Sequence, residues 1–138
     1  MFIGYFTTPN SVWAQVPSAP TMVSPSNGAT GISLTPTFSW SSVSGATGYG
    51  LYISRSNGDG TWTLIYDSDT GYPSGISGTS LAPSVTFVNG TNYRWNMRAR
   101  NSSGWGSYTA SQFTFTTIAA VPSAPTMVSP SNGATGIS

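Results

Sequence analysis

The chain has 138 residues, of which 38% are hydrophobic and only 5% are charged, and its formal net charge is +1. It contains no Lys, Glu, His or Cys, which excludes the usual zinc sites, a thiol nucleophile and an imidazole base. The four Arg form no basic run, which excludes a nucleic-acid footprint. No apolar run has the length of a membrane-spanning helix. We expect neither enzymatic activity nor a metal or cofactor.

A long internal repeat sets the organisation of the chain. The segment Val16–Ser33 returns letter for letter as Val121–Ser138, at an offset of 105 residues. Because chance identity over eighteen positions is negligible, 105 residues is the period of a tandem repeat. We therefore expect a leader at residues 1–15, one domain of about a hundred residues at 16–120 and the start of a second repeat at 121–138. The leader is interpreted either as a truncated signal peptide or as an N-terminal strand.

The first part of the repeat is rich in proline and turn residues. Three prolines between positions 17 and 25 exclude a helix and leave room for a short edge strand around Thr21–Ser24. An Asn-Gly pair at 27–28 and a Thr-Gly pair at 30–31 predict turns. Pro36 cannot donate to a ladder, so the next strand is predicted to begin at Thr37.

A hairpin is predicted in the middle of the repeat. Residues Tyr49–Ser54 alternate with period two and predict a strand. The Asn-Gly-Asp-Gly sequence at 57–60 predicts a tight turn into a second strand at Thr61–Tyr66. Residues 67–80 are predicted to form a loop, followed by a short strand near Leu81 or within Val85–Val88.

The clearest alternation of apolar and polar residues runs from Asn92 to Asn101 and predicts a strand with one buried face. Its apolar face carries Tyr, Trp, Met and Ala, and its outward face carries three of the four Arg. A turn is predicted at 102–104 and a last strand at 113–116.

About seven short strands, about ten residues apart and without a helical segment, predict an all-β fold, an antiparallel sandwich of two sheets. The apolar positions of these strands define the expected core. The predicted core residues are Phe38, Trp40, Tyr49, Leu51, Ile53, Leu64, Leu81, Tyr93, Trp95, Met97, Phe113 and Phe115.

Six motifs carry a family resemblance: SPSNGATG at 24–31, FSW at 38–40, GATGY at 45–49, NGTNYRW at 89–95, RARN at 98–101 and FTFTT at 113–117. In their order and spacing they resemble the bacterial fibronectin type III-like domain, an Ig/fibronectin type III-like β-sandwich of about seven strands. The resemblance implies that the hydroxyl of Tyr93 ties its strand to the preceding turn, and that the domain is a spacer, adhesion or accessory module outside the cell. It implies no ligand, because one fold hosts many functions. It also does not imply integrin-type recognition, because the sequence contains no Arg-Gly-Asp tripeptide.

Four side chains are candidate surface contacts: Arg94, Arg98, Arg100 and Trp62. The Arg stripe, with Tyr52 across from it, is interpreted as a contact for an anionic glycan or for a neighbouring subunit. The competing interpretation is that the Arg stems lie along exposed aromatic rings and keep the sheet face soluble. Trp62 and Trp105 are candidates for stacking on sugar rings, or for edge packing and subunit contact.

Two other kinds of site follow from short motifs. Asn89 and Asn101 fit the acceptor pattern for N-glycosylation and fall in predicted turns. Asp67 and Asp69 offer two carboxylates, whereas calcium needs six to eight oxygen ligands. This pair is therefore interpreted as the polar end of a strand rather than as a calcium site.

The expected function is that of an extracellular structural repeat protein, which forms a fibre or surface array by head-to-tail association of its domains. A first strand that returns at 121–138 is a template for pairing with another domain. The assembly strand is expected at Thr126, Met127, Val128 and Ser129. The expected partners are copies of the chain or adjacent repeats of a longer tandem array, with neither nucleic acid nor a membrane span involved. The alternative is a carbohydrate-binding or adhesin module of a longer secreted protein, with glycans as partners, and both interpretations place the chain outside the cell or at its surface.

Overall fold

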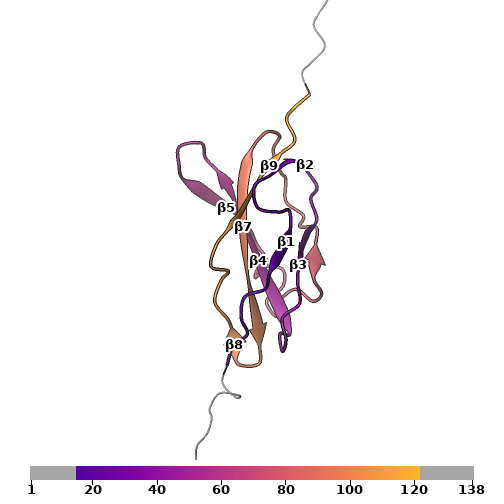
Figure 1. Cartoon of the computed structure of the whole chain (residues 1–138), viewed down its shortest axis with the longest axis vertical. Helices are drawn as coiled ribbons and strands as arrows, with labels where there is room; N and C mark the ends of the chain where they lie inside the picture. Colours follow the sequence, from indigo (N-terminus) through magenta and orange to yellow (C-terminus); the bar gives the residue numbers. More distant parts are fainter. Residues whose placement is uncertain (1–14, 122–138) are drawn as a thin grey trace, which may run out of the picture.

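The computed structural model describes residues 15–121, which form nine β-strands and no helix (Figure 1). The strands are β1 (Met22–Ser24), β2 (Ala29–Ile32), β3 (Phe38–Trp40), β4 (Gly48–Ser56), β5 (Trp62–Asp67), β6 (Ser80–Leu81), β7 (Asn92–Asn101), β8 (Gly104–Trp105) and β9 (Phe113–Thr117). Within this described part of the chain there is accordingly no helix that could cross a membrane.

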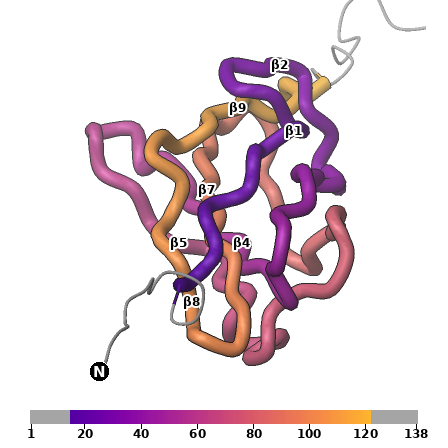
Figure 2. Tube along the Cα trace, turned by 60° about the horizontal axis from the view of Figure 1, so that its bottom comes forward, coloured from indigo at the N-terminus to yellow at the C-terminus, as the bar shows by residue number. Residues whose placement is uncertain are grey.

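The strands form two sheets that enclose one core (Figures 1 and 2). The smaller sheet has the order β1-β3-β6, and the larger sheet has the order β2-β9-β7-β4-β5, with β8 beside β7. Neighbouring strands are antiparallel except for β2 and β9, which are parallel. The predicted all-β sandwich of two sheets is confirmed, although one strand pair is parallel rather than antiparallel.

The long pair β4 and β7 forms the centre of the larger sheet, with Leu51 opposite Met97. The alternation predicted for β7 is confirmed, since its inward residues are fully buried and its outward residues are partly exposed. Because β-strand side chains alternate between faces, this one strand gives the core Tyr93, Trp95, Met97 and Ala99. Trp95 packs edge-on against Phe38 of the smaller sheet, with ring centroids 5.0 Å apart.

Most of the predicted core is confirmed. The buried members are Phe38, Trp40, Tyr49, Leu51, Ile53, Tyr93, Trp95, Met97 and Phe115. Leu81 and Phe113 are partly buried and pack against this cluster. Met22 and Phe87, which lie in segments predicted as possible short strands, also belong to it, and so does Ile76, which lies in the predicted loop at residues 67–80.

Leu64 was predicted to be in the core, and this prediction is wrong because the side chain is 56% exposed. The pairing of β4 with β5 shifts where Ile53 lies opposite Tyr66 and Ser54 lies opposite Leu64. The step leaves Ile65 as an extra residue on β5, a β-bulge that interrupts the alternation of faces. Ile65 packs against the core instead.

Two predicted turns contain short strands. The pair at 30–31 lies within β2, and the parallel register with β9 shifts between Ala29 and Ile32. Gly31 has a φ of 66° there, a left-handed conformation that glycine adopts without a steric penalty. The predicted turn at 102–104 runs into β8, which pairs with the end of β7. The alternative strand at Val85–Val88 is absent from the described residues, where β6 at Ser80–Leu81 takes its place.

The tie expected for Tyr93 is confirmed. Its hydroxyl oxygen accepts a hydrogen bond of 2.7 Å from the backbone amide of Val88. Tyr49 does the same for the amide of Val43 at 2.8 Å. Each hydroxyl accepts a hydrogen bond from an amide in a loop, so both tyrosines fix a loop onto the end of a strand.

Candidate functional site

The duplicated sequence Val16–Ser33, called here the edge segment, closes one side of the sandwich. Its strand β1 forms the edge of the smaller sheet, and its strand β2 forms the edge of the larger sheet. One continuous piece of chain therefore forms an edge of both sheets.

Hydrogen bonds hold the edge segment to both sheets. On the smaller sheet, the amide of Ser41 donates to the carbonyl of Thr21 at 2.9 Å. On the larger sheet, the amide of Gly28 donates to the carbonyl of Thr114 at 2.7 Å. The amide of Thr114 in turn donates to Oδ1 of Asn27 at 2.9 Å.

Apolar anchors accompany these bonds. Met22 is 6% exposed and lies opposite Trp40 in the register of β1 with β3. Between the two sheets, the indole Nε1 of Trp95 donates to the carbonyl of Pro25 at 3.3 Å. The edge segment is thus recognised by a defined set of groups that belong to residues outside it.

The two ends of the described chain lie at opposite ends of the sandwich (Figures 1 and 2). The edge segment begins beside β8, at what we call the lower pole, and Val121 follows β9 at the upper pole. The predicted assembly residues, Thr126 to Ser129, lie outside the described residues. Their identical counterparts, Thr21 to Ser24, include β1.

The Arg stripe on the outward face of β7 is covered by aromatic rings. The guanidinium of Arg98 lies 4.4 Å from the ring centre of Trp105 and 4.8 Å from that of Tyr108. Arg98 also donates from Nη2 to Oδ2 of Asp69 and from Nε to the hydroxyl of Tyr52, both at 2.8 Å. The hydroxyl of Tyr52 donates to Oδ1 of Asp69 at 2.9 Å. Burial raises the pKa of the Tyr52 phenol well above its ordinary value.

The other two arginines of the stripe are engaged in the same way. Arg94 lies 4.5 Å from the ring centre of Trp62, and Arg100 lies 5.3 Å from that of Trp105. Arg100 also donates to the carbonyl of Pro73 at 3.1 Å. These contacts are cation–π interactions, and they favour the interpretation in which the Arg side chains lie along aromatic rings. Asp69 and Tyr108 complete the stack from loops. Tyr108 had no signal in the sequence, and Asp69 was considered only beside Asp67 as a possible calcium ligand.

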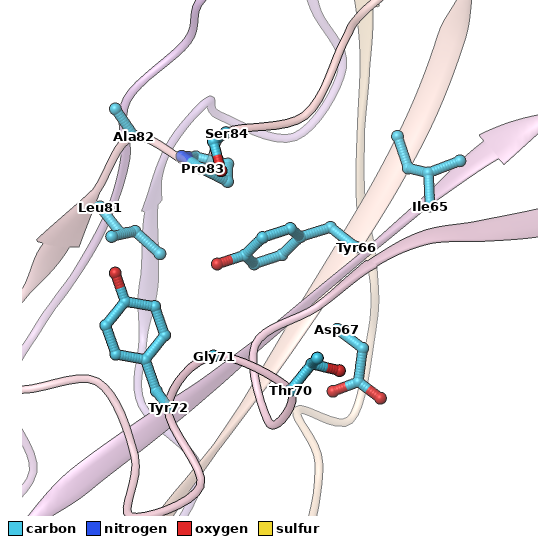
Figure 3. Close-up of a pocket in the computed structure, with 10 residues that line it drawn as sticks. All are labelled: Ile65, Tyr66, Asp67, Thr70, Gly71, Tyr72, Leu81, Ala82, Pro83 and Ser84. Carbon is cyan, nitrogen blue, oxygen red and sulfur yellow. The ribbon is translucent and has the colours of Figure 1, made fainter.

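A pocket of about 680 Å³ lies between the edges formed by β5 and β6. Figure 3 shows the phenol groups of Tyr66 and Tyr72 pointing toward Leu81 from different segments, with Pro83 above them. Burial raises the pKa of Tyr66, so this phenol stays neutral at ordinary pH. The lining combines aromatic faces with hydroxyl groups and one carboxylate, that of Asp67.

The remaining sequence candidates have structural partners. The exposed Asn89 donates from Nδ2 to the carbonyl of Ile118 at 3.2 Å, and Asn101 donates from Nδ2 to the carbonyl of Gln15 at 2.9 Å. Asp67 accepts the amide of Asp69 at 2.9 Å. In residues 15–121, no three His, Cys, Asp or Glu side chains come close enough together to hold a metal ion.

Comparisons with known proteins find similarities among solved structures. No protein-family model matches the chain, and a search of curated proteins finds no match. Among solved structures, the chain is similar to FN3tt, with 20% identity over 75% of this chain and 97% of that chain and a TM-score of 0.46. It is also similar to the fibronectin type III domain of human fibronectin type III domain containing protein 3, with 20% identity over 80% of this chain and 94% of that chain and a TM-score of 0.47. A third similar structure is that of CopC from Methylosinus trichosporium OB3b, with 18% identity over 76% of this chain and 99% of that chain and a TM-score of 0.46.

Proposed function

We propose that the chain is a non-catalytic structural building block that assembles head to tail outside the cell. In this proposal, residues 121–138 of one unit occupy the place of the edge segment in the next domain. The observation that carries the proposal is that one domain needs the edge segment once, whereas the chain contains its sequence twice.

Complementarity supports this exchange. Every group that holds the edge segment, from Ser41 to Trp95 and Thr114, is present in each copy of the domain. Because residues 121–138 are identical to the edge segment, they offer the same amides, carbonyls and apolar anchors in the same order. A segment with unpaired backbone groups and a site of matching register would pair in this way.

The positions of the two poles make the association directional. The edge segment begins at the lower pole, while Val121 lies at the upper pole. The ten residues of β7 alone span about 33 Å, so residues 121–138 would have to run back along the whole domain to fill their own domain's site. Filling the site of a second domain extends the chain of domains instead. Such a heterologous contact forms a filament unless its rotation closes a ring.

The domain's own edge segment competes with the incoming copy. It is tethered, and short tethers give effective concentrations on the order of millimolar. Assembly by exchange is therefore expected to rise steeply with protein concentration, while repeats joined in one longer chain would need no exchange. The extracellular setting rests on the low charge and on the resemblance of the motifs to secreted fibronectin type III-like repeats.

Electron microscopy of the 138-residue chain at high concentration tests the proposal. Filaments are expected, with an axial repeat slightly above the roughly 33 Å that a ten-residue strand spans. The matched control is the chain Met1–Ala120, which keeps its own edge segment but lacks the second copy and should stay monomeric. Polymers of this shorter chain would refute strand donation.

The tyrosine pocket supports a second candidate function, the binding of a neutral glycan. Tyr66 and Tyr72 present ring faces beside hydroxyl groups in one hollow (Figure 3), and sugar rings combine apolar faces with hydroxyls. Trp62, by contrast, already has Arg94 against its ring. Binding on a glycan array that is lost in Tyr72→Ala but kept in Trp62→Ala would favour this pocket, and a blank array would exclude it for the glycans tested.

A further inference from the structure

Val16 and Val121 hold the same position in the repeat but differ in their surroundings. Val16 lies beside Gly104 at the lower pole and is 42% exposed, whereas Val121 at the upper pole is 88% exposed. In a continued array, Val121 is the first residue of the next edge segment, so it would lie against Gly104 of the next domain. The difference in exposure is the part of Val121 that a neighbouring domain would cover.

A hydrogen bond crosses the same boundary. Asn101 donates from Nδ2 to the backbone carbonyl of Gln15, the residue immediately before the repeat begins. At the offset of 105 residues, Ala120 takes the place of Gln15. Since the acceptor is a backbone carbonyl, this change of side chain leaves the bond possible. Asn101 is held in position by the amide of Ser103, which donates to its Oδ1 at 2.8 Å.

The connection between successive domains is short. The amide of Ile118 still donates to the carbonyl of Ile32 in its own domain at 2.8 Å. Only Ala119 and Ala120 separate Ile118 from Val121, and three steps of chain span at most about 11 Å. The upper pole of one domain is therefore held close to the lower pole of the next.

Both poles are suited to such a contact. The upper pole exposes the apolar side chains of Val88 and Ile118, at 48% and 47%. The lower pole has a hollow of about 990 Å³ whose lining includes Ser44, Asn101 and Tyr108, with no charged side chain. An apolar knob and an uncharged hollow can meet without desolvating an ion, which would be costly.

We infer that the upper pole of each domain docks directly onto the lower pole of the next, with Ala120 and Val121 held by Asn101 and by the surface around Gly104. The inference rests on the proposed function, because the partner is a second copy of the domain. It applies equally to domains joined in one chain and to domains joined by exchange, since both place residue 121 of one unit at position 16 of the next.

A two-domain chain tests this interface. Residues 1–138 are continued by a second copy of residues 34–120, and nuclear spin relaxation measures whether the domains tumble together. The expected result is the correlation time of one rigid particle of twice the domain mass. Asn101→Ala in the second domain should shift this correlation time toward that of a single domain. The matched control is Asn101→Ala in the first domain, where the partner is the carbonyl of Gln15, and it should leave the joint tumbling unchanged.

Independent tumbling in the parent two-domain chain would overturn the interface, and equal effects of the two Asn101 variants would overturn the role of this residue. The result is separate from the test of the proposed function. Here the domains are joined covalently, so their contact can be measured whether or not the 138-residue chain forms filaments.

Discussion

The backbone carbonyl of Pro17 lies against the α-carbon of Gly106, and no side chain fits between them. A Cβ at position 106 would overlap the Pro17 carbonyl oxygen and would also lie 3.3 Å from the carbonyl oxygen of Ala99. All of these neighbours are backbone atoms, which cannot rotate away. The close approach sets the point where the edge segment meets the larger sheet.

Gly106→Ala is therefore expected to lower the free energy of unfolding by about 1–3 kcal/mol, the usual cost of overpacking. Urea denaturation followed by tryptophan fluorescence measures it. Gly71→Ala is the matched control, since a Cβ there meets nothing within 4 Å and its φ is not positive; its effect should stay within about 0.5 kcal/mol. Similar losses for both variants would contradict the close approach.

Tyr93→Phe removes the hydroxyl that accepts the amide of Val88 and leaves the ring in the core. We expect a loss of about 1–2 kcal/mol, because the amide loses its partner in a partly buried place. The same denaturation experiment applies, with Tyr72→Phe as control, since its ring is 38% exposed. If Tyr93→Phe proved as stable as the control, the hydrogen bond from Val88 to the Tyr93 hydroxyl would not contribute to the free energy of unfolding.

Stability should be flat across neutral pH and fall in alkali. The sequence has no His, Cys, Lys or Glu, so few groups titrate between the aspartates and the tyrosines. Burial raises the pKa of Tyr52 and of Tyr66 in the folded state. A group whose pKa is raised by folding stabilises the fold fully below its unfolded pKa, about 10 for Tyr, and this stabilisation is lost as the pH rises above that value.

The measurement is the free energy of unfolding between neutral pH and strong alkali. The loss above about pH 10 should be smaller in Tyr52→Phe, because this variant has one fewer raised phenol to titrate. An identical alkaline slope in the variant and the parent chain would show that Tyr52 does not contribute.

A chain that starts at Leu34 and ends at Ser138 lacks its own edge segment but keeps the second copy. We expect it to polymerise at low concentration, because no tethered segment competes and its own copy starts at the wrong pole. Sedimentation velocity would follow the polymers. The chain Leu34–Ala120 is the control and should be unfolded or aggregated until a peptide of residues 121–138 is added. A folded monomer of Leu34–Ser138 would mean that the segment folds back onto its own domain.

The sequence was sufficient to predict the fold because its strands alternate clearly. The alternation in β7 and the hairpin turn at 57–60 depend on neighbouring residues alone, and both were predicted. Leu64 was misplaced because a bulge depends on how two strands pair, which a single strand does not encode. Ile76 was missed for a related reason, since it pairs with Tyr49 by an isolated bridge from a loop.

The candidate site was only partly predictable. The repeat of the edge segment is visible in the sequence, but its place at the edges of both sheets depends on the topology. The Arg stripe was predicted from β7, whereas its partner Asp69 is 29 residues away from Arg98 and lies in a loop. Contacts of this kind arise from the path of the chain in space, and a local sequence pattern does not predict them.

The parallel pairing of β2 with β9 has a mechanical consequence. Traced backward from β2, the chain passes through β1 to Gln15 at the lower pole. Traced forward from β9, it reaches Val121 at the upper pole (Figure 1). Tension along the domain would pull these two strands past each other. The hydrogen bonds from Gly28 to Thr114 and from Ile118 to Ile32 would then be loaded in shear, all at once rather than one after another. Repeats joined in one chain would resist stretching up to a threshold force and then lengthen one domain at a time, whereas in a filament built by exchange the same hydrogen bonds would set the force at which two units separate.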